Sequence, residues 1–266
     1  MPPNSTAAEL LAAVQASPRA VTAHDRAAWV GLFTADAAVD DPVGSRPHTG
    51  RDAIERFYDT FIAPNTIVFD VSHDIVCPPT VFRDLTIEIT MSAGAAVAVP
   101  MHLRYDLADQ DGLWKIARLH AHWELGPMIG QLLRTGGPGL LAGLQLGRRL
   151  VRHQGVGGAA GMLRALVGVG GAGKYEAERV FSAAAATEIG DIRGLLGADA
   201  IVELGGNRVT IEEFINRTRN MMWDKLIAAG NTVTASVLIG EVPGIALVEF
   251  VSSTGRITAV RLFLDR

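Results

Sequence analysis

The chain is poor in cysteine and has no excess of basic residues. Its 266 residues include one cysteine, Cys77, so no disulfide can form within the chain, and we expect a reducing, cytoplasmic setting. The formal net charge of −4 argues against a general nucleic-acid-binding protein. No apolar run reaches the ~18 residues of a membrane-spanning helix, and no signal peptide is expected at the N-terminus. A hydrophobic content of 48% instead predicts a packed globular protein.

Acidic residues are missing from one long stretch. Between Glu124 and Glu176 there is no aspartate or glutamate, although more than half of the chain's 29 glycines lie there. The cations of this stretch are Arg134, Arg148, Arg149, Arg152, Arg164 and Lys174. We expect residues 126–173 to form short apolar helices that connect two domains and bury most of their leucines inside the molecule or against a second copy. The alternative is a cationic amphipathic segment that lies on anionic lipid.

The two sides of this stretch repeat each other weakly. ADAAVD at 35–40 matches ADAIVE at 198–203, and a helix-like segment precedes each of them. A second helical segment follows each, and both halves end with a glycine turn and an alternating strand. Helices that come first and antiparallel strands that follow are typical of α+β domains. The sequence therefore predicts two α+β domains, at residues 1–125 and 174–266.

The alternating segments give the expected strands. They are 66–76, 80–92, 95–107 and 113–124 in the first half, and 231–238, 244–252 and 256–264 in the second. The pair Ser17-Pro18 resembles an N-cap followed by a proline at the first helical position, so we expect the first helix to be interrupted there.

A glycine-rich motif near the second domain is a weak signal. GVGGAGK at 168–174 fits a dinucleotide-binding pattern and nearly fits a phosphate-binding loop, but Tyr175 stands where a serine or threonine should hold a metal ion. Both motifs need parallel βα units, whereas the pattern here predicts antiparallel strands. We therefore expect no nucleotide or other organic cofactor.

A pair of histidines is a weak metal signal. His120 and His122 share one face of an expected strand, and a metal site would need a third ligand at a matched distance. The alternate residues Leu119, Ala121 and Trp123 form the apolar face. We expect the histidines to lie at an interface or in solvent, and we expect no metal.

Two adjacent carboxylates precede a proline in VDDPVGSRPHTG at 39–50. An apolar surrounding raises the pKa of a carboxylate toward working pH, so that it can take up and return a proton. The acid pair Asp40-Asp41 therefore fits a positioned general base, and a solvated turn is the alternative. If Asp41 is the base, alternation places Asp40 on the opposite side, in a solvated or capping position.

The segment LFTADAAVDDPVGSRPHTGRDAIERFYDTFI at 32–62 resembles the ketosteroid isomerases of the nuclear transport factor 2-like superfamily. The resemblance depends on the acidic residue before Asp-Pro-Val-Gly, the proline after it and the helix with Phe-Tyr, and it covers roughly residues 15–125. It implies a cystatin-like cone, in which a curved antiparallel sheet wraps helices around an apolar pocket. The second half resembles a degenerate copy of this cone, which implies a pseudo-dimer within the chain or a homodimer.

The resemblance also implies roles for individual residues. Asp41 corresponds to the general base, and Tyr58 corresponds to a tyrosine beside the oxyanion hole. The usual oxyanion donors are missing, because Ser17 and Leu103 stand at their positions, and Phe33 replaces a supporting tyrosine. Since losing one such donor costs about 10²–10³ in rate, a substitute donor would be needed.

Alternation on the strand AVPMHLRYDL decides which side chains face the pocket. Met101, Leu103 and Tyr105 form its apolar face, and His102 faces away. Tyr58 or Tyr105 could serve as the substitute donor if its hydroxyl points inward. The expected pocket walls are Phe33, Phe57, Met101, Leu103, Tyr105 and Trp123.

In the second domain Leu204 and Ile215 stand where Asp41 and Tyr58 stand in the first, so a structural role is expected there. The sequence favours an isomerase-like enzyme that moves a proton within a small hydrophobic, steroid-like ketone. A non-catalytic carrier or sensor with the same pocket is the second hypothesis, and a membrane-peripheral scaffold that uses residues 126–173 is the third. Relatives in the superfamily include dehydratases, polyketide cyclases and epoxide hydrolases, so the fold alone does not fix the reaction.

Overall fold

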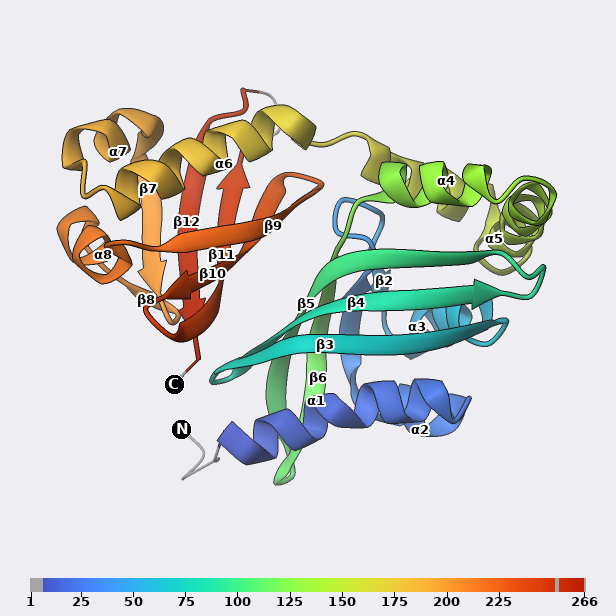
Figure 1. Ribbon diagram of the computed structural model, residues 1–266. Coiled ribbons are helices and arrows are strands. Elements are labelled where there is room, and N and C mark those ends of the chain that lie inside the picture. The colour runs from blue at the N-terminus through green and yellow to red at the C-terminus, as the bar shows by residue number, and fades with distance from the viewer. Residues whose placement is uncertain (1–6, 252–253, 266) are drawn as a thin grey trace.

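Two curved six-stranded sheets, each packed against its own helices, make up the molecule (Figure 1). The structure is a computed structural model that describes residues 7–251 and 254–265. The first six residues, on which part of the signal-peptide expectation depends, lie outside this description. The predicted α+β class with two tandem cones is confirmed. The division at residues 125 and 173 stays a prediction.

The first sheet has the strand order β2-β1-β6-β5-β4-β3. Its strands are β1 (Phe33–Asp40), β2 (His48–Thr49), β3 (Asn65–Cys77), β4 (Thr80–Met91), β5 (Ala96–Gln110) and β6 (Leu113–His122). Its helices are α1 (Ala7–Thr22), α2 (Arg26–Gly31), α3 (Arg51–Phe57) and a π-helical turn, η1 (Tyr58–Ile62). The four long strands are the expected ones to within a few residues. All neighbouring strands are antiparallel except β1 and β6, which pair in parallel.

The expected interruption of the first helix at Ser17-Pro18 is wrong, because α1 continues through Pro18. Ser17 is buried, and its Oγ accepts a hydrogen bond from Trp29 Nε1 at 3.1 Å instead of capping a helix. This hydrogen bond joins α1 to α2, and the two helices together form one wall of the cone.

The second sheet repeats the first with every strand number raised by six, in the order β8-β7-β12-β11-β10-β9. Its strands are β7 (Leu196–Leu204), β8 (Asn207–Arg208), β9 (Met222–Ala229), β10 (Thr232–Ile239), β11 (Val242–Phe250) and β12 (Ile257–Leu264). Its helices are α6 (Gly170–Ala185), α7 (Ile189–Leu195) and α8 (Ile211–Thr218). β7 pairs in parallel with β12, as β1 does with β6. The weak sequence repeat is therefore a duplication of topology.

Sequence reasoning missed strand β9. Its sequence MWDKLIAA has charged residues in the middle, and Lys225 has a positive φ of 44° beside a shift in the β9–β10 register. The ammonium group of Lys225 has a partner in the other domain, since Lys225 Nζ donates to Asp84 Oδ1 of β4 at 2.5 Å. A strand that is polar because it meets another domain does not show the alternation of a half-buried strand.

The two sheets pack against each other through a mixed interface. An apolar cluster contains Phe82 and Phe263, whose ring centroids are 4.7 Å apart. Beside it, Asp84 Oδ2 accepts from Ser236 Oγ at 2.6 Å, and His102 Nδ1 hydrogen-bonds with Thr234 Oγ1 at 2.8 Å. Burial lowers the pKa of His102 to about 3, against the opposing effect of Asp84. His102 is therefore a neutral interface residue that faces away from the first cone's interior.

His122 also lies at this interface, where its Nδ1 hydrogen-bonds with Thr232 Oγ1 at 3.2 Å. Its side chain is buried. In the part of the chain that the structure describes, no three side chains of metal-binding type come together.

Helices α4 (Leu125–Arg134) and α5 (Gly137–Leu163) and the short turn η2 (Arg164–Leu166) connect the two halves and lie beside the first cone (Figure 1). Met128, Leu132 and Leu150 are buried. The expectation that most leucines here are buried within the molecule is wrong. Six are 49–67% exposed: Leu133, Leu140, Leu141, Leu144, Leu163 and Leu166.

The reason is that the connector is a single layer that covers the cone with one face only. Burial of the outward leucines against a second copy stays a prediction. None of the described helices is long and apolar enough to cross a membrane.

Candidate functional site

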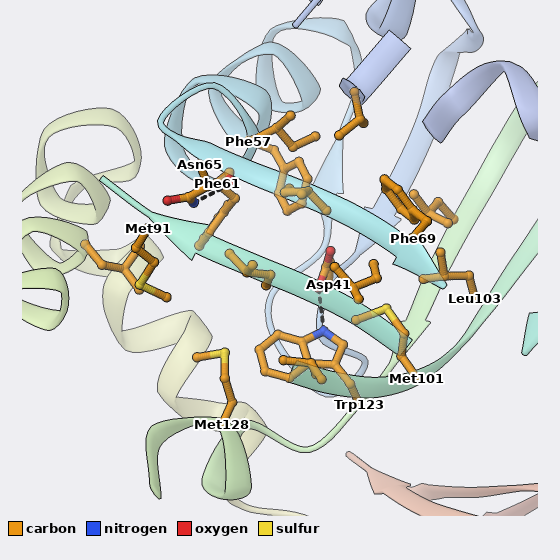
Figure 2. A pocket seen from close by; sticks show the side chains of 18 of the residues that line it. Asp41, Phe57, Phe61, Asn65, Phe69, Met91, Met101, Leu103, Trp123 and Met128 are labelled. Atoms are coloured by element: carbon orange, nitrogen blue, oxygen red, sulfur yellow. Dashed lines mark hydrogen bonds between the residues drawn. The ribbon is translucent and has the colours of Figure 1, made fainter. Parts of the chain in front are cut away.

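A mainly apolar cavity of about 140 Å³ lies inside the first cone. Side chains on the inner faces of β3, β4 and β5 form its long walls, because alternate residues of each strand point inward. Ser17 and Trp29 close one side, and Met128, Gln145 and Met162 of the connector close another. Figure 2 shows Asp41 among these walls, with the ring of Trp123 beside it. The connector is thus part of the site.

Five of the expected wall residues line this cavity: Phe57, Met101, Leu103, Tyr105 and Trp123. Phe33 and Tyr58 do not, and the prediction for these two is corrected. Both rings pack on Trp29, with centroids 4.7 Å and 5.6 Å away, and Trp29 supplies the wall instead. Sequence reasoning missed Trp29, although it begins an apolar segment, residues 29–33, that comes shortly before the candidate base and was a usable signal.

Asp41 follows directly on β1 and lines the cavity. Its Oδ1 accepts a hydrogen bond from Trp123 Nε1 at 2.6 Å (Figure 2). Among the described residues, no lysine or arginine forms an ion pair with it. Burial raises the pKa of Asp41 to about 6, against the opposing effect of the Trp123 hydrogen bond and with a further rise from the charge of Asp40. At neutral pH the carboxylate is ionised yet unusually basic.

Asp40 occupies the opposite side of β1, as predicted. The prediction that it is solvated or caps an element is wrong, because it pairs with a histidine. Its Oδ2 lies 2.8 Å from His120 Nδ1, and its side chain is 14% exposed. The pairing follows from the parallel β1–β6 register, which places Asp40 opposite His120. Asp106 lies 3.7 Å from the other ring nitrogen of His120. Only the tertiary pairing of the first and last strands brings these groups together.

Tyr105 is the tyrosine that reaches the cavity. Its side chain is fully buried, its hydroxyl hydrogen-bonds with Ser17, and Asp41 is close enough to influence its ionisation. Burial raises the pKa of Tyr105 to about 12, so the hydroxyl stays protonated and can donate. The hydroxyl of Tyr58 is buried without a hydrogen-bond partner among the described groups, and it does not line the cavity.

The second cone lacks this chemistry at the corresponding place. Leu204 ends β7 where Asp41 follows β1, and Ile215 is a buried residue of α8. Both are apolar, so no carboxylate or hydroxyl stands at either position.

Comparison with known families assigns the first half. Residues 14–118 match the family described as the SnoaL-like domain. This segment is a SnoaL-like domain of the nuclear transport factor 2-like superfamily. The match covers less than half of the chain, and it includes Asp41 and the strands around the cavity.

Several solved structures are similar to part of this chain. They include a Delta 5-3-ketosteroid isomerase from Mycobacterium sp., which is 28% identical and aligns over 44% of this chain and 95% of its own, with a TM-score of 0.41. A Mycobacterium tuberculosis protein in complex with estradiol-17beta-hemisuccinate is 27% identical over 44% of this chain and 95% of its own, with a TM-score of 0.41. Because these scores are low, the assignment rests on the family match to the SnoaL-like domain.

Proposed function

We propose that the SnoaL-like domain is an enzyme that moves a proton within a small hydrophobic ketone, with Asp41 as the general base. The observation that supports this proposal most is the environment of Asp41. Its carboxylate faces an apolar cavity, has one neutral hydrogen-bond donor and has a pKa raised to about 6. A general base works best when its pKa lies near the operating pH.

The reaction needs no group beyond the protein and the ligand. The Asp41 carboxylate takes a proton from the carbon between a carbonyl and a carbon–carbon double bond, and the electron pair moves onto the carbonyl oxygen. Asp41 then returns the proton to the far carbon of the conjugated system, so the double bond moves next to the carbonyl. At the end of the reaction Asp41 is again ionised, and the product is an isomer of the substrate with the same atoms.

Charge that develops on the carbonyl oxygen needs a hydrogen-bond donor. The Tyr105 hydroxyl is the candidate, since it is protonated and belongs to the wall of the same cavity. Leu103, at the position of the family's carboxylic-acid donor, offers none. Because one missing oxyanion donor typically costs about 10²–10³ in rate, we expect a slow enzyme.

A carrier or sensor of hydrophobic ligands is the alternative function. The apolar Leu103 in the wall favours it, because this wall can hold a ligand without polarising it. Under this alternative Asp41 would accept a hydrogen bond from a ligand hydroxyl and would transfer no proton.

The size of the cavity bears on the substrate. About 140 Å³ is below the range of about 300–1,000 Å³ that drug-sized ligands occupy. A compact ring system fits this volume better than a complete steroid, which would have to extend beyond it.

The test is turnover of β,γ-unsaturated ketones, one monocyclic and one steroidal, followed by the absorbance of the conjugated product. We expect Asp41→Asn to lose at least about 10³-fold in rate while it keeps its fold and its affinity for the product. Asp40→Asn is the matched control and should change the rate by less than about tenfold. Binding without turnover in the unsubstituted protein would support the carrier, and the absence of both would refute either function.

We also propose that the outer face of the connector contacts an anionic membrane surface from the cytoplasmic side. Four exposed leucines, Leu133, Leu140, Leu141 and Leu144, lie in a stretch without acidic residues. Apolar side chains together with cations on one helix are typical of segments that lie in a membrane interface. A second copy of the chain is the competing partner for this face.

A further inference from the structure

A second cavity, of about 480 Å³, adjoins the apolar one. Three residues line both cavities: Asp41, Phe61 and Met162. Figure 2 shows Phe61 and Asp41 among the side chains that line the apolar cavity. The other walls of the second cavity come from the loop that follows Asp41, from β2, from α3 and from α5. A ligand that fills the apolar cavity can therefore continue past Asp41 into a space of different chemistry.

The walls of the second cavity carry hydrogen-bond donors without partners. Neither Arg46 nor Arg56, both of which line it, forms an ion pair with any described carboxylate. Ser45 Oγ and Gln154 Nε2 are buried there and have no hydrogen-bond partner among the described groups. Buried polar groups are normally paired, and an unpaired one costs free energy that a ligand acceptor can recover.

The charge of this cavity is one-sided. Apart from Asp41 at the boundary, its lining contains no acidic residue. His48 faces it too, and burial lowers the pKa of His48 to about 4, with Arg56 and Arg46 lowering it further and Asp40 opposing them. His48 is thus neutral at physiological pH, and the two arginines supply the positive charge.

The connector holds this cavity in place through a glycine contact. A Cβ on Gly161 of α5 would lie 2.8 Å from Arg46 Cβ, so only glycine permits this approach. The helix thereby packs on the stem of Arg46. The connector thus contacts the aliphatic part of Arg46, although Arg46 as a whole is exposed to solvent.

We propose that the second cavity binds the carboxylate of an amphipathic keto acid whose apolar, carbonyl-bearing part occupies the first cavity. Arginine suits this task because its planar guanidinium binds a carboxylate through two parallel hydrogen bonds. The proposal deepens the proposed function by naming the substrate class, and it relies on that function only for the place of the apolar part. The small volume of the apolar cavity supports it, since a larger ligand must leave that cavity somewhere.

Calorimetric titration with naphthoylpropionic acid and with its methyl ester tests the proposal, because the two probes share the aryl ketone and differ in charge. We expect the acid to bind at least about tenfold more tightly than the ester, an advantage that high salt reduces. Arg46→Gln together with Arg56→Gln should remove the advantage and leave ester binding unchanged. Arg51→Gln is the control, since Arg51 lies in α3 like Arg56 but does not line the cavity and pairs with Glu55. Melting curves show that each variant is folded.

The outcomes separate this inference from the proposed function. Equal affinity for acid and ester, or no binding of the acid, would overturn the carboxylate site even if neutral ketones are turned over. A preference for the acid that depends on Arg46 and Arg56 would support the site even if no ketone is turned over. A preference that persists in the double variant would overturn it as well.

Discussion

At Asp41, burial and one hydrogen bond shift the pKa in opposite directions. Burial acts more strongly, so the pKa rises to about 6, while the Trp123 indole keeps the ionised form accessible. A carboxylate in solution would be a weaker base, and a carboxylate paired with an arginine would be weaker still. The geometry that supports the proposed chemistry therefore also costs the protein stability.

We expect this cost to appear in the pH dependence of unfolding. Asp41 binds its proton more tightly in the folded state, at about 6 against an ordinary 3.8, so its contribution to stability falls as pH rises between these values. Asp41→Asn removes this loss and should raise the free energy of unfolding at pH 7 by up to ~3 kcal/mol, with little effect near pH 3.5. Urea unfolding at the two pH values measures it. Equal effects at both would show that burial does not perturb Asp41.

The two buried tyrosines give a second prediction for single residues. Tyr105→Phe keeps the ring and removes the hydroxyl of a residue that lines the cavity, so we expect the rate of ketone turnover to fall about 10²-fold. Tyr58→Phe removes a hydroxyl that does not line the cavity, so the rate should stay within about threefold. Steady-state rates of both variants, with melting temperatures alongside, decide it. A larger loss for Tyr58→Phe would restore that residue to the site.

Helices α4 and α5 combine two roles that their sequence does not separate. Their inner side closes the cavity with Met128, Gln145 and Met162, and their outer side carries leucines in a region without acidic residues. Strands β3 to β5, by contrast, place one face on the cavity and the other against the second sheet. A helix that both covers a cavity and exposes leucines is suited to receive an apolar ligand from a lipid surface.

Vesicle sedimentation tests the outer face of α5. We expect binding to phosphatidylglycerol vesicles and little binding to phosphatidylcholine vesicles, with Leu144→Glu reducing it at least about fivefold. Leu113→Glu is the matched control, because Leu113 is 64% exposed and Leu144 is 67% exposed, but Leu113 lies outside the acid-free stretch. If the protein instead forms a dimer that Leu144→Glu disrupts, this face contacts a second copy.

At the scale of the whole molecule, the second cone supports the loop that carries the site. Gly44, three residues after Asp41, lies against Gly230 in the turn between β9 and β10, where an added Cβ would be 2.7 Å from Gly44 Cα. Val169 N donates to Gly230 O at 2.9 Å, which fixes the same turn to the end of the connector. The second cone thus limits where the loop after Asp41 can lie, although it has no carboxylate of its own at that place.

Gly230→Ala and Gly240→Ala separate this support from backbone strain. Both glycines have a positive φ, 54° and 62°, so both substitutions should cost about 1 kcal/mol in stability. Only a Cβ on Gly230 meets other atoms within 4 Å, whereas a Cβ on Gly240 meets none. Ligand affinity in the first cone should fall about tenfold for Gly230→Ala alone. Equal affinities in the two variants, measured by calorimetry, would remove the second cone from the site.

Several features of this protein are determined by its sequence alone. The four long strands of the first sheet and the duplication follow from local periodicity, and the candidate base Asp41 follows from the family resemblance of one compact motif. Alternation in β5 placed Met101, Leu103 and Tyr105 on one face and His102 on the other, because side chains in a strand alternate regardless of what packs on them.

Tertiary structure decided what lies opposite these residues. Trp29 forms the part of the cavity wall that was expected from Phe33. Asp40 pairs with His120 across the parallel β1–β6 contact. Strand β9 can carry the charged residue Lys225 because Asp84 of the other domain binds it. The two cavities likewise combine side chains from the loop after β1, from α3 and from α5. Periodicity describes one segment at a time, whereas burial, ion pairing and cavity lining depend on segments that are distant in the chain and meet only in the folded state.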